Sequence, residues 1–217
     1  MSKIQKRLQI IANLVNYRNI CDVGCDHGKL SEYLLRNNMV DSVIVSDISL
    51  PSLNKAIDLL SKRNYNFEYI HCDGLTGYSG KNVDQCVISG MGGDEIIKII
   101  SNSPIEIKSY ILSPQHNNIE VKKFIISKGY NIDYDIIIKD KDKFYNIFRC
   151  VVSNNKDLLT QYDLYFGKAN FESKDSNIFE FVESEIKKIN KILEKTPNNK
   201  YLSEYLDLLK EFNKRNK

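Results

Sequence analysis

Two carboxylates, Asp22 just before it and Asp26 within it, mark a glycine-bounded turn close to the N-terminus. Asn19–Val23 is an apolar stretch typical of a buried strand, and Gly24 and Gly28 bracket the turn that leads from it into a helix. A dinucleotide site presents backbone NH groups to a pyrophosphate at this place, whereas Asp22 and Asp26 would repel one. Two acids attract instead a ligand with cationic groups, such as the sulfonium and ammonium of S-adenosylmethionine. The turn therefore predicts a nucleoside-type cofactor site; the alternative is a plain turn with Asp26 as the helix cap.

A third carboxylate ends the next apolar run, Ser42–Asp47. Asp47 lies 19 residues beyond Gly28, and Ile48 follows it. A nucleotide-binding strand–helix–strand unit places an acid at about this spacing to accept hydrogen bonds from the ribose hydroxyls. The spacing therefore predicts that Asp47 binds the ribose of the cofactor. Capping of a helix that begins near Pro51 is the alternative.

Glycine-containing turns also follow the third and fourth apolar runs. Phe67–His71 leads to Asp73 and Gly74, and the fourth run ends in Ser89–Gly93 with three glycines. An acid beside a glycine suits recognition of an adenine amino group, although a plain turn uses the same residues. The three later glycines predict room for a planar base or cofactor at the rim where open α/β sheets bind ligands.

Neutral hydrogen-bonding side chains are densest in Ser113–Asn117, directly after the fifth apolar run, Ile107–Leu112. Gln and Asn amides match the paired donor and acceptor of adenine. Gln115 and Asn117 therefore favour a contact with a target base. A proline-containing turn with Asn117 as a helix N-cap explains the same residues equally well.

Length and composition limit what can surround these residues. The chain has 217 residues, of which 42% are hydrophobic, enough for one substantial core with about 60 residues left over. The net charge of +3 permits a nucleic-acid partner without requiring one. No apolar run of about 18 residues and no cleavable leader is present, so we expect neither membrane insertion nor secretion. Five cysteines without a C-x-x-C pair fit the cytoplasm and predict no metal site.

The elements that position these residues follow from apolar periodicity. Residues 3–16 form an amphipathic helix that we expect on the edge of the sheet, with a basic start that suits solvent better than a phosphate. Two further strands, residues 130–139 and 143–153, are joined by a short charged connection, which predicts a hairpin and an antiparallel last strand. Seven strands with helices between the first six and a closing hairpin predict the Rossmann-like α/β fold of a class I methyltransferase.

The C-terminal part has a different pattern. Apolar residues recur at spacings of three and four between Phe179 and Leu193 and again between Leu202 and Phe212, on either side of a turn near Pro197. This predicts two helices in an antiparallel coiled-coil hairpin, and hence a catalytic domain of residues 1–155 and a helical domain of residues 156–217. The lysines near the tip of the hairpin predict either a solvated face or a grip on an RNA backbone. They include Lys187, Lys188, Lys191, Lys195 and Lys200.

Together these motifs resemble the TrmK family, bacterial enzymes that methylate N1 of the adenine at position 22 of tRNA. The resemblance covers the whole chain, including the C-terminal hairpin. It is carried by Ser2 to Leu8, Asp22 to Gly28, Asp73-Gly74-Leu75, Ser89 to Gly93 and Lys141 to Ile147. The chain departs from the family pattern where Ser113, Pro114 and Gln115 stand in place of Gln-Pro-Asn, and where Asp47 stands in place of a frequent Glu.

The chemistry of the fourth turn agrees with methylation of a ring nitrogen. Enzymes that methylate an exocyclic amine generally carry an Asp/Asn-Pro-Pro-aromatic box after strand four, and this chain has Gly90-Met-Gly-Gly93 there. Adenine N1 has an in-plane lone pair, so alignment matters more than deprotonation. The product is cationic, and Asp26 is our candidate to stabilise its charge or accept a proton, with His27 second. The alternative is that both residues only hold the cofactor.

The sequence thus predicts an S-adenosylmethionine-dependent tRNA (adenine-N1)-methyltransferase that acts as a cytoplasmic monomer. A methyltransferase for small molecules or proteins with a dimerising hairpin, and a non-catalytic RNA-binding protein, are the alternatives; a nicotinamide dehydrogenase conflicts with the acidic turn. The predicted cofactor residues are Asp22, Gly24, Cys25, Asp26, His27, Gly28, Asp47, Ile48, Asp73, Gly74, Ser89, Gly90 and Met91. The predicted substrate residues are Gly92, Ser113, Pro114, Gln115, His116, Asn117, Lys187, Lys188 and Lys191.

Overall fold

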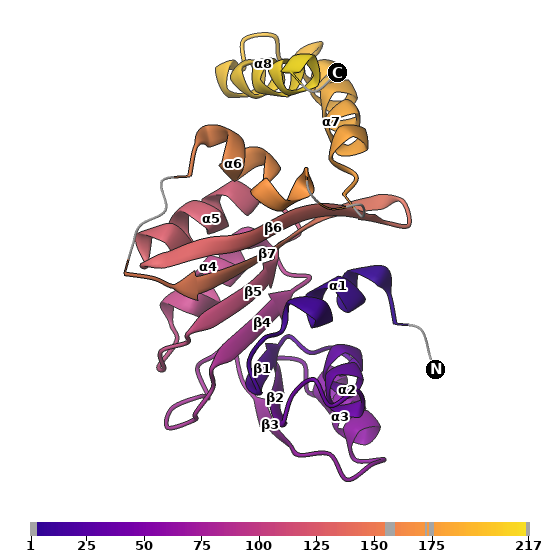
Figure 1. Cartoon of the computed structure of the whole chain (residues 1–217), viewed down its shortest axis with the longest axis vertical. Helices are drawn as coiled ribbons and strands as arrows, with labels where there is room; N and C mark the ends of the chain where they lie inside the picture. The colour runs from indigo at the N-terminus through magenta and orange to yellow at the C-terminus, as the bar shows by residue number, and fades with distance from the viewer. Residues whose placement is uncertain (1–3, 155–158, 172, 174–175, 216–217) are drawn as a thin grey trace.

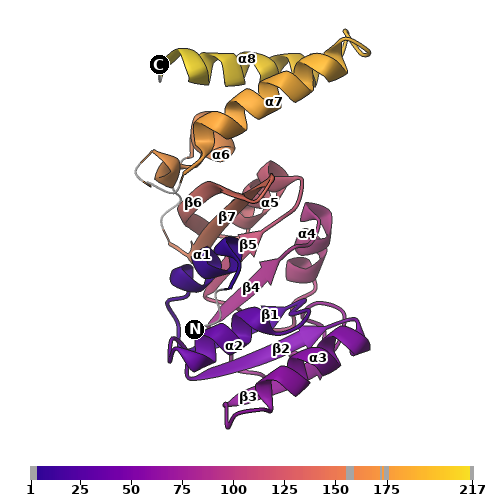
Figure 2. The ribbon, with the colours of Figure 1, turned by 90° about the vertical axis from the view of Figure 1, so that its right-hand side faces the viewer.

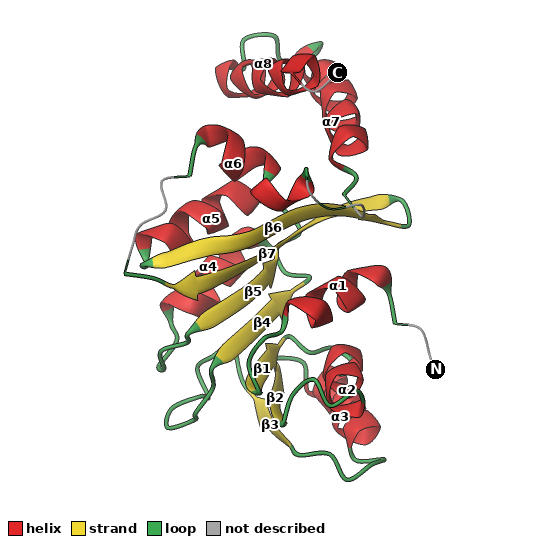
Figure 3. Ribbon diagram, in the orientation of Figure 1, coloured by secondary structure: helices red, strands yellow, loops and turns green. Residues whose placement is uncertain are grey.

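A computed structural model describes residues 4–154, 159–171, 173 and 176–215 of the chain. A seven-stranded sheet runs through the middle of the molecule (Figures 1 and 3), in the order β3-β2-β1-β4-β5-β7-β6. The strands are β1 Asn19–Val23, β2 Ser42–Asp47, β3 Phe67–His71, β4 Gln85–Ser89, β5 Ser109–Ser113, β6 Tyr130–Asp140 and β7 Lys143–Val152. The first five are parallel, and β7 lies antiparallel between β5 and β6. The predicted α/β sheet with an antiparallel last strand is confirmed. The expectation of a helix between each of the first six strands was wrong in one place, because turns alone connect β3 to β4.

The first strand lies inside the sheet, because β1 pairs with β2 on one side and with β4 on the other. The connections that leave β1 and β4 therefore diverge, which opens a crevice at the carboxyl ends of these two strands. The strands next to the crevice are almost wholly buried, as expected of parallel strands covered on both faces. The glycine-rich turns after β1 and β4 both lie at this crevice.

Helices cover both faces of the sheet (Figure 2). One face carries α1 Lys6–Leu14, α2 Lys29–Arg36 and α3 Leu50–Leu60, and the other carries α4 Gly93–Ser101 and α5 Asn118–Ser127. The first helix lies close to the expected sheet edge. Ile11 of α1 packs in one cluster with Ile147 of β7 and Ile136 of the edge strand β6, and Arg7 N donates to Asp140 Oδ2 of β6 at 3.1 Å. The helix therefore covers the face of the sheet beside its β6 edge.

The C-terminal residues form α6 Gln161–Phe166, the 3₁₀ turn η1 Lys168–Asn170, α7 Ile178–Leu193 and α8 Lys200–Arg215. The two predicted helices are present as α7 and α8, and they lie beyond the β6 edge of the sheet (Figure 2). Phe179 at the start of α7 contacts Phe212 near the end of α8, with ring centroids 5.7 Å apart, so the pair is antiparallel. Its core also takes in Phe166 of α6, which the heptad pattern does not predict. The coiled-coil geometry stays a prediction.

The helix α6, which the sequence analysis missed, begins with a capping box in which Thr160 and Asp163 bond each other's backbone NH groups. A buried lysine links this helix to the sheet. Lys122 Nζ of α5 donates to the carbonyl of Leu164 in α6 at 2.8 Å, and it forms an ion pair with Asp135 Oδ2 of β6 at 2.6 Å. The predicted domain boundary at residues 155–156 and Ser2 lie outside the described residues. In the described part of the chain, no helix is long and apolar enough to span a membrane.

Candidate active site

The turn after β1 is shaped by three residues with left-handed backbone. Gly24, Asp26 and Gly28 have φ angles of 70°, 50° and 67°, a region that favours glycine and tolerates aspartate. The turn is fastened to the end of β2, since Gly24 N and Cys25 N both donate to Ser46 O, at 2.9 and 3.0 Å. Its backbone therefore curves around the crevice in a fixed shape.

Asp47 joins this turn to the start of α3. Its Oδ2 accepts from Asp26 N at 3.1 Å, and its Oδ1 accepts from Ser49 N at 2.8 Å. The helix cap itself is Ser49, whose side chain accepts from Ser52 N, so the alternative of Asp47 as the cap is wrong. Each carboxylate oxygen keeps a further lone pair for a ligand hydroxyl.

A cavity of about 450 Å³ lies at the carboxyl ends of β1 and β4. A small annex of about 30 Å³ adjoins it on the β2 side. The predicted cofactor residues that line the larger cavity are Asp22, Gly24, Cys25, Asp26, His27, Asp47, Ser89, Gly90 and Met91. Those that line the annex are Gly24, Asp47, Ile48, Asp73, Gly74 and Met91. Of the predicted cofactor residues, Gly28 alone lines neither space, because it packs against α3, where an added Cβ would lie 2.9 Å from Ala56 Cβ.

Met91 separates the cavity from the annex. Its Cε lies 2.0 Å from the place where a Cβ on Gly24 would stand, so a side chain at position 24 would displace the tip of Met91. In the annex, Ile48 is exposed by 66% and Asp73 forms an ion pair with Lys98 at 3.1 Å. A planar base can enter the annex only if the flexible Met91 side chain moves aside.

Asp22 is the most buried carboxylate of the cavity, with 5% of its surface exposed. Ser31 Oγ donates to its Oδ2 at 2.7 Å. Burial above all, opposed by the Ser31 hydrogen bond and aided by the charge of Asp47, raises the pKa of Asp22 to about 6. The ionised Asp22 carboxylate therefore lies in a site of low dielectric, where the Ser31 hydroxyl is its neutral hydrogen-bond donor. A cation in the cavity would stabilise this charged form. This charge arrangement fits the ammonium and sulfonium of S-adenosylmethionine.

The two predicted catalytic residues form a pair at the cavity wall. His27 Nδ1 lies 2.8 Å from Asp26 Oδ2, and their side chains are 40% and 70% exposed. Asp26 does not cap the following helix, since the N-cap position is Gly28 and no side-chain cap bond is formed. The carboxylate is therefore available to a substrate that approaches from solvent. Among the described residues, no cluster of His, Cys, Asp and Glu has the makeup of a metal site.

Hydrogen bonds join the loop after β4 to the loop after β5. Gln115 donates through its backbone NH to Met91 O at 2.9 Å and through Nε2 to Gly90 O at 2.5 Å. Gly90 N donates to Ser113 O at 3.1 Å. Gln115 is thereby held at the cavity wall, whereas Ser113 and Pro114 are buried behind it.

The space beside the last two glycines of the β4 loop is filled by protein. A Cβ on Gly92 would lie 2.8 Å from the His116 ring, and a Cβ on Gly93 would lie 2.7 Å from His116 O. The expectation that these two glycines leave room for a ligand was therefore wrong. They permit the close approach of the two loops. Asn117 occupies the N-cap position of α5, but its side chain donates to Asp94 Oδ2 at 3.0 Å instead of capping the helix.

The remaining predicted substrate residues are divided between two places. His116, Asn117 and Lys188 line a second cleft that Gln115 also reaches. Lys187 and Lys191 are exposed on α7 and do not line it. The structure thus separates the loop residues from two of the three lysines assigned to the same substrate.

Arg7 and Tyr145 also line the cavity at the carboxyl ends of β1 and β4, although the motifs assigned them no site role. The Arg7 guanidinium stacks 4.9 Å from the centre of the Tyr145 ring and lies 3.7 Å from the place of a Gly90 Cβ. Both residues fall within the segments that carry the family resemblance, which was the only signal for them. Arg7 adds a cation to a cavity otherwise dominated by carboxylates.

The family model described as tRNA (adenine(22)-N(1))-methyltransferase, TrmK, matches residues 20–217. The chain belongs to the TrmK family. A putative tRNA methyltransferase of Mycoplasma genitalium is 33% identical over 149 residues, which cover 66% of this chain and 68% of that protein. The structure of M. capricolum TrmK in complex with S-adenosylhomocysteine is 27% identical, with a TM-score of 0.86 over 96% of this chain and 97% of that one.

A lower identity still preserves the TrmK fold. The structure of the B. subtilis m1A22 tRNA methyltransferase TrmK is 21% identical, with a TM-score of 0.83 over 97% of this chain and 99% of that one. Membership of the TrmK family confirms the predicted fold and the predicted tRNA methyltransferase function with S-adenosylmethionine as cofactor. It excludes the dehydrogenase reading of the glycine turn.

Proposed function

We propose that this TrmK-family chain transfers a methyl group from S-adenosylmethionine to N1 of adenine 22 in tRNA, in the cavity at the carboxyl ends of β1 and β4. The observation that carries this proposal is Asp22, a buried carboxylate with a raised pKa on the wall of a nucleoside-sized cavity. Such a group favours a cationic ligand over a diphosphate.

Different residues of the cavity bind different parts of the cofactor. Asp47 accepts hydrogen bonds from the ribose hydroxyls, and Ile48 and Asp73 hold the adenine in the annex once Met91 has moved. Asp22 faces the ammonium and the sulfonium, and Arg7 balances the carboxylate of the amino acid end. S-adenosylmethionine supplies the activated methyl group, so no metal ion is needed for this transfer.

The target adenine lies beside Gln115, at the opening of the cavity. Its N1 lone pair must point along the axis of the breaking bond, and orientation supplies most of the catalysis. Asp26, whose carboxylate is held by His27, stabilises the positive charge that develops on the base. The adenine must first leave its stack in the tRNA, at a cost of a few kcal/mol. The exposed lysines of α7 hold the RNA backbone while it does so.

The active species in this proposal is a monomer. A tRNA substrate supports a cytoplasmic location. The residues 156–217 serve in this proposal as the tRNA-binding part and the residues before them as the catalytic part.

The activity is tested with labelled S-adenosylmethionine and two transcripts of one bacterial tRNA that differ only in adenine or guanine at position 22. We expect label in the first transcript and none in the second. Equal labelling of both would refute position 22, and label found only in protein or in small molecules would refute a tRNA substrate.

Asp26→Ala should abolish methyl transfer and leave the Kd for tRNA and for S-adenosylhomocysteine within about twofold, since the exposed carboxylate acts on the charge of the reacting base. Asp58→Ala, which removes an exposed carboxylate on α3, is the matched control and should keep full activity. Unchanged turnover of Asp26→Ala would show that the assignment is wrong. A large loss of cofactor affinity would show that Asp26 only holds the cofactor.

A further inference from the structure

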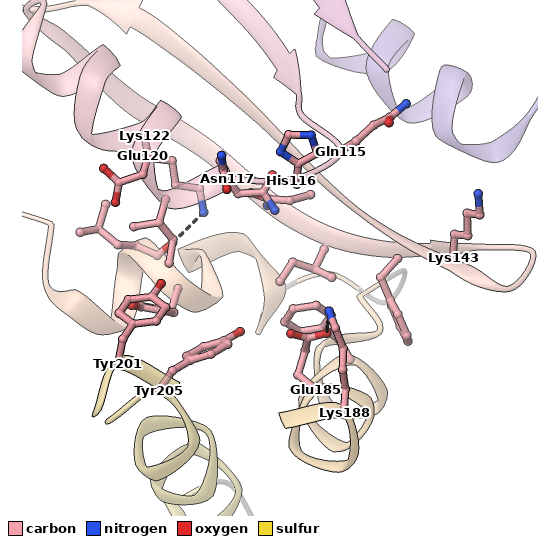
Figure 4. A pocket seen from close by; sticks show the side chains of 18 residues that line it. Gln115, His116, Asn117, Glu120, Lys122, Lys143, Glu185, Lys188, Tyr201 and Tyr205 are labelled. Atoms are coloured by element: carbon pink, nitrogen blue, oxygen red, sulfur yellow. Dashed lines mark hydrogen bonds and ion pairs between the residues drawn. The ribbon is translucent and has the colours of Figure 1, made fainter. Parts of the chain in front are cut away.

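A second cleft, of about 510 Å³, lies between the sheet and the C-terminal helices (Figure 4). The start of α5 and the β6–β7 hairpin form one wall, and α6, α7 and α8 form the other. Gln115 lines both this cleft and the cofactor cavity. An RNA strand that leaves the proposed methylation site past Gln115 would therefore enter this cleft next.

Aromatic rings dominate the helical wall of the cleft. Tyr165, Tyr201 and Tyr205 line it together, and the rings of Tyr165 and Tyr205 lie 5.0 Å apart at an angle of 34°. Tyr201, on the first turn of α8, is 61% exposed. Accessible aromatic rings in a groove are the usual platforms on which bases of single-stranded RNA stack.

The opposite wall holds hydrogen-bond acceptors without partners. Asn146 is 6% exposed, and its Nδ2 donates to Asp135 Oδ1 at 2.6 Å and to Ile136 O at 3.1 Å. These two acceptors fix the orientation of the amide, and its buried Oδ1 has no hydrogen-bond partner among the residues described. The same holds for Asn118 Oδ1. Both residues line the cleft, but the two oxygens are themselves buried, so an NH donor of a nucleobase would satisfy them only after a shift of the cleft wall.

The charges at the cleft suit a single nucleotide better than a free polyanion. Lys143 stands at one end in the β6–β7 hairpin, and Lys188 of α7 is paired with Glu185 at 3.2 Å (Figure 4). Glu120 and Glu185 offset much of this positive charge inside the cleft. A neutral base can lie between the walls beside Tyr201 and Tyr205, while Lys143, at the opposite end of the cleft (Figure 4), faces the RNA backbone further along.

We propose that this cleft binds a second nucleotide of the RNA, a neighbour of the methylated adenine, with its base stacked on Tyr201 and Tyr205. The proposal rests on the tRNA methyltransferase function proposed above. Stacking of the neighbour in the cleft offsets part of the cost of unstacking the target adenine. It also draws the RNA past Gln115, so that the target base is delivered to the cofactor cavity.

Fluorescence offers a direct test, because the chain contains no tryptophan. Tyr201→Trp introduces a single indole into the cleft. Tyr69→Trp is the matched control, since Tyr69 is 59% exposed on the edge strand β3 and does not line the cleft. With S-adenosylhomocysteine present to prevent turnover, we expect unmodified tRNA to quench the emission of the Tyr201→Trp protein and to leave that of the Tyr69→Trp protein unchanged.

A second arm measures affinity. Tyr201→Ala should raise the Kd for tRNA about 5- to 100-fold, the range for loss of one base-stacking contact. Tyr201→Phe keeps the ring and should stay within about twofold of the wild type, and neither variant should change the Kd for S-adenosylhomocysteine. If tRNA is bound and methylated but the indole at 201 is not quenched and Tyr201→Ala binds normally, the cleft proposal is refuted while the proposed function stands. If tRNA is neither bound nor methylated by the wild type, both are refuted.

Discussion

Replacing Asp22 with Asn should raise the free energy of unfolding of the cofactor-free protein at pH 8 and lower its affinity for the cofactor. In the folded chain, burial raises the pKa of Asp22 from 3.8 to about 6. A shift of about two units corresponds to about 3 kcal/mol between the two protonation states. Because the folded pKa is the higher one, the neutral acid stabilises the fold below about pH 4, and this contribution is lost as the pH rises through about 6.

At pH 8 the folded protein therefore holds an ionised carboxylate at a cost of up to about 3 kcal/mol, which Asp22→Asn removes while Ser31 can still donate to the amide oxygen. Near pH 4 the gain should vanish. For a protein of this size, about 3 kcal/mol corresponds to a rise in Tm of several degrees.

Cofactor affinity should change in the opposite sense. At pH 5 about one Asp22 in ten is ionised, so wild-type affinity should be about tenfold lower than at pH 8. The Asp22→Asn protein should bind about 10- to 100-fold more weakly at pH 8, the range for loss of a charged hydrogen bond, and its pH profile should be flatter.

Urea unfolding at pH 4.5 and pH 8, together with calorimetric titration by S-adenosylmethionine, measures both effects. Asp58→Asn, on the exposed face of α3, is the control for a change of net charge. A loss of stability at pH 8, or wild-type affinity with an unchanged pH profile, would refute the role that we give to the buried carboxylate.

Three further predictions follow from other parts of the fold. Gly24→Ala should weaken cofactor binding at least tenfold in calorimetry, because its methyl group would occupy space in the cavity and the annex, both of which Gly24 lines; Gly80→Ala, with a similar φ of 74° but open space around it, carries the same backbone strain of about 1–2 kcal/mol and should bind normally. Lys122→Met should cost about 3–5 kcal/mol in urea unfolding by leaving Asp135 buried without its partner, and addition of Asp135→Asn should restore most of that loss; an unchanged midpoint in the single variant would contradict a stabilising pair. Neutralising Lys187, Lys188 and Lys191 should weaken tRNA binding and flatten its salt dependence, and an unaltered slope would leave α7 with a structural role alone.

Many residues that line the cavity at the carboxyl ends of β1 and β4 could be predicted, because the rules that gather them are local. Asp22 and Asp47 lie in or at the end of a parallel strand, and Asp73 closely follows one. The carboxyl ends of parallel strands meet at one edge of a sheet, so the order of strands along the chain is enough to bring these residues together. The closing hairpin was predictable for the same reason, since its connection is only a few residues long.

The tertiary structure alone decided how the more distant segments meet this edge. The amphipathic pattern of α1 identifies its apolar face but not the strands that bury it, and Arg7 reaches the cavity only because Ile11 packs over β6 and β7. The heptads of α7 and α8 likewise do not predict that Phe166 joins their core. Apolar burial is non-directional, so periodicity says which side of a helix is buried, while shape and packing of distant segments select its partner and with it the cleft beside Gln115.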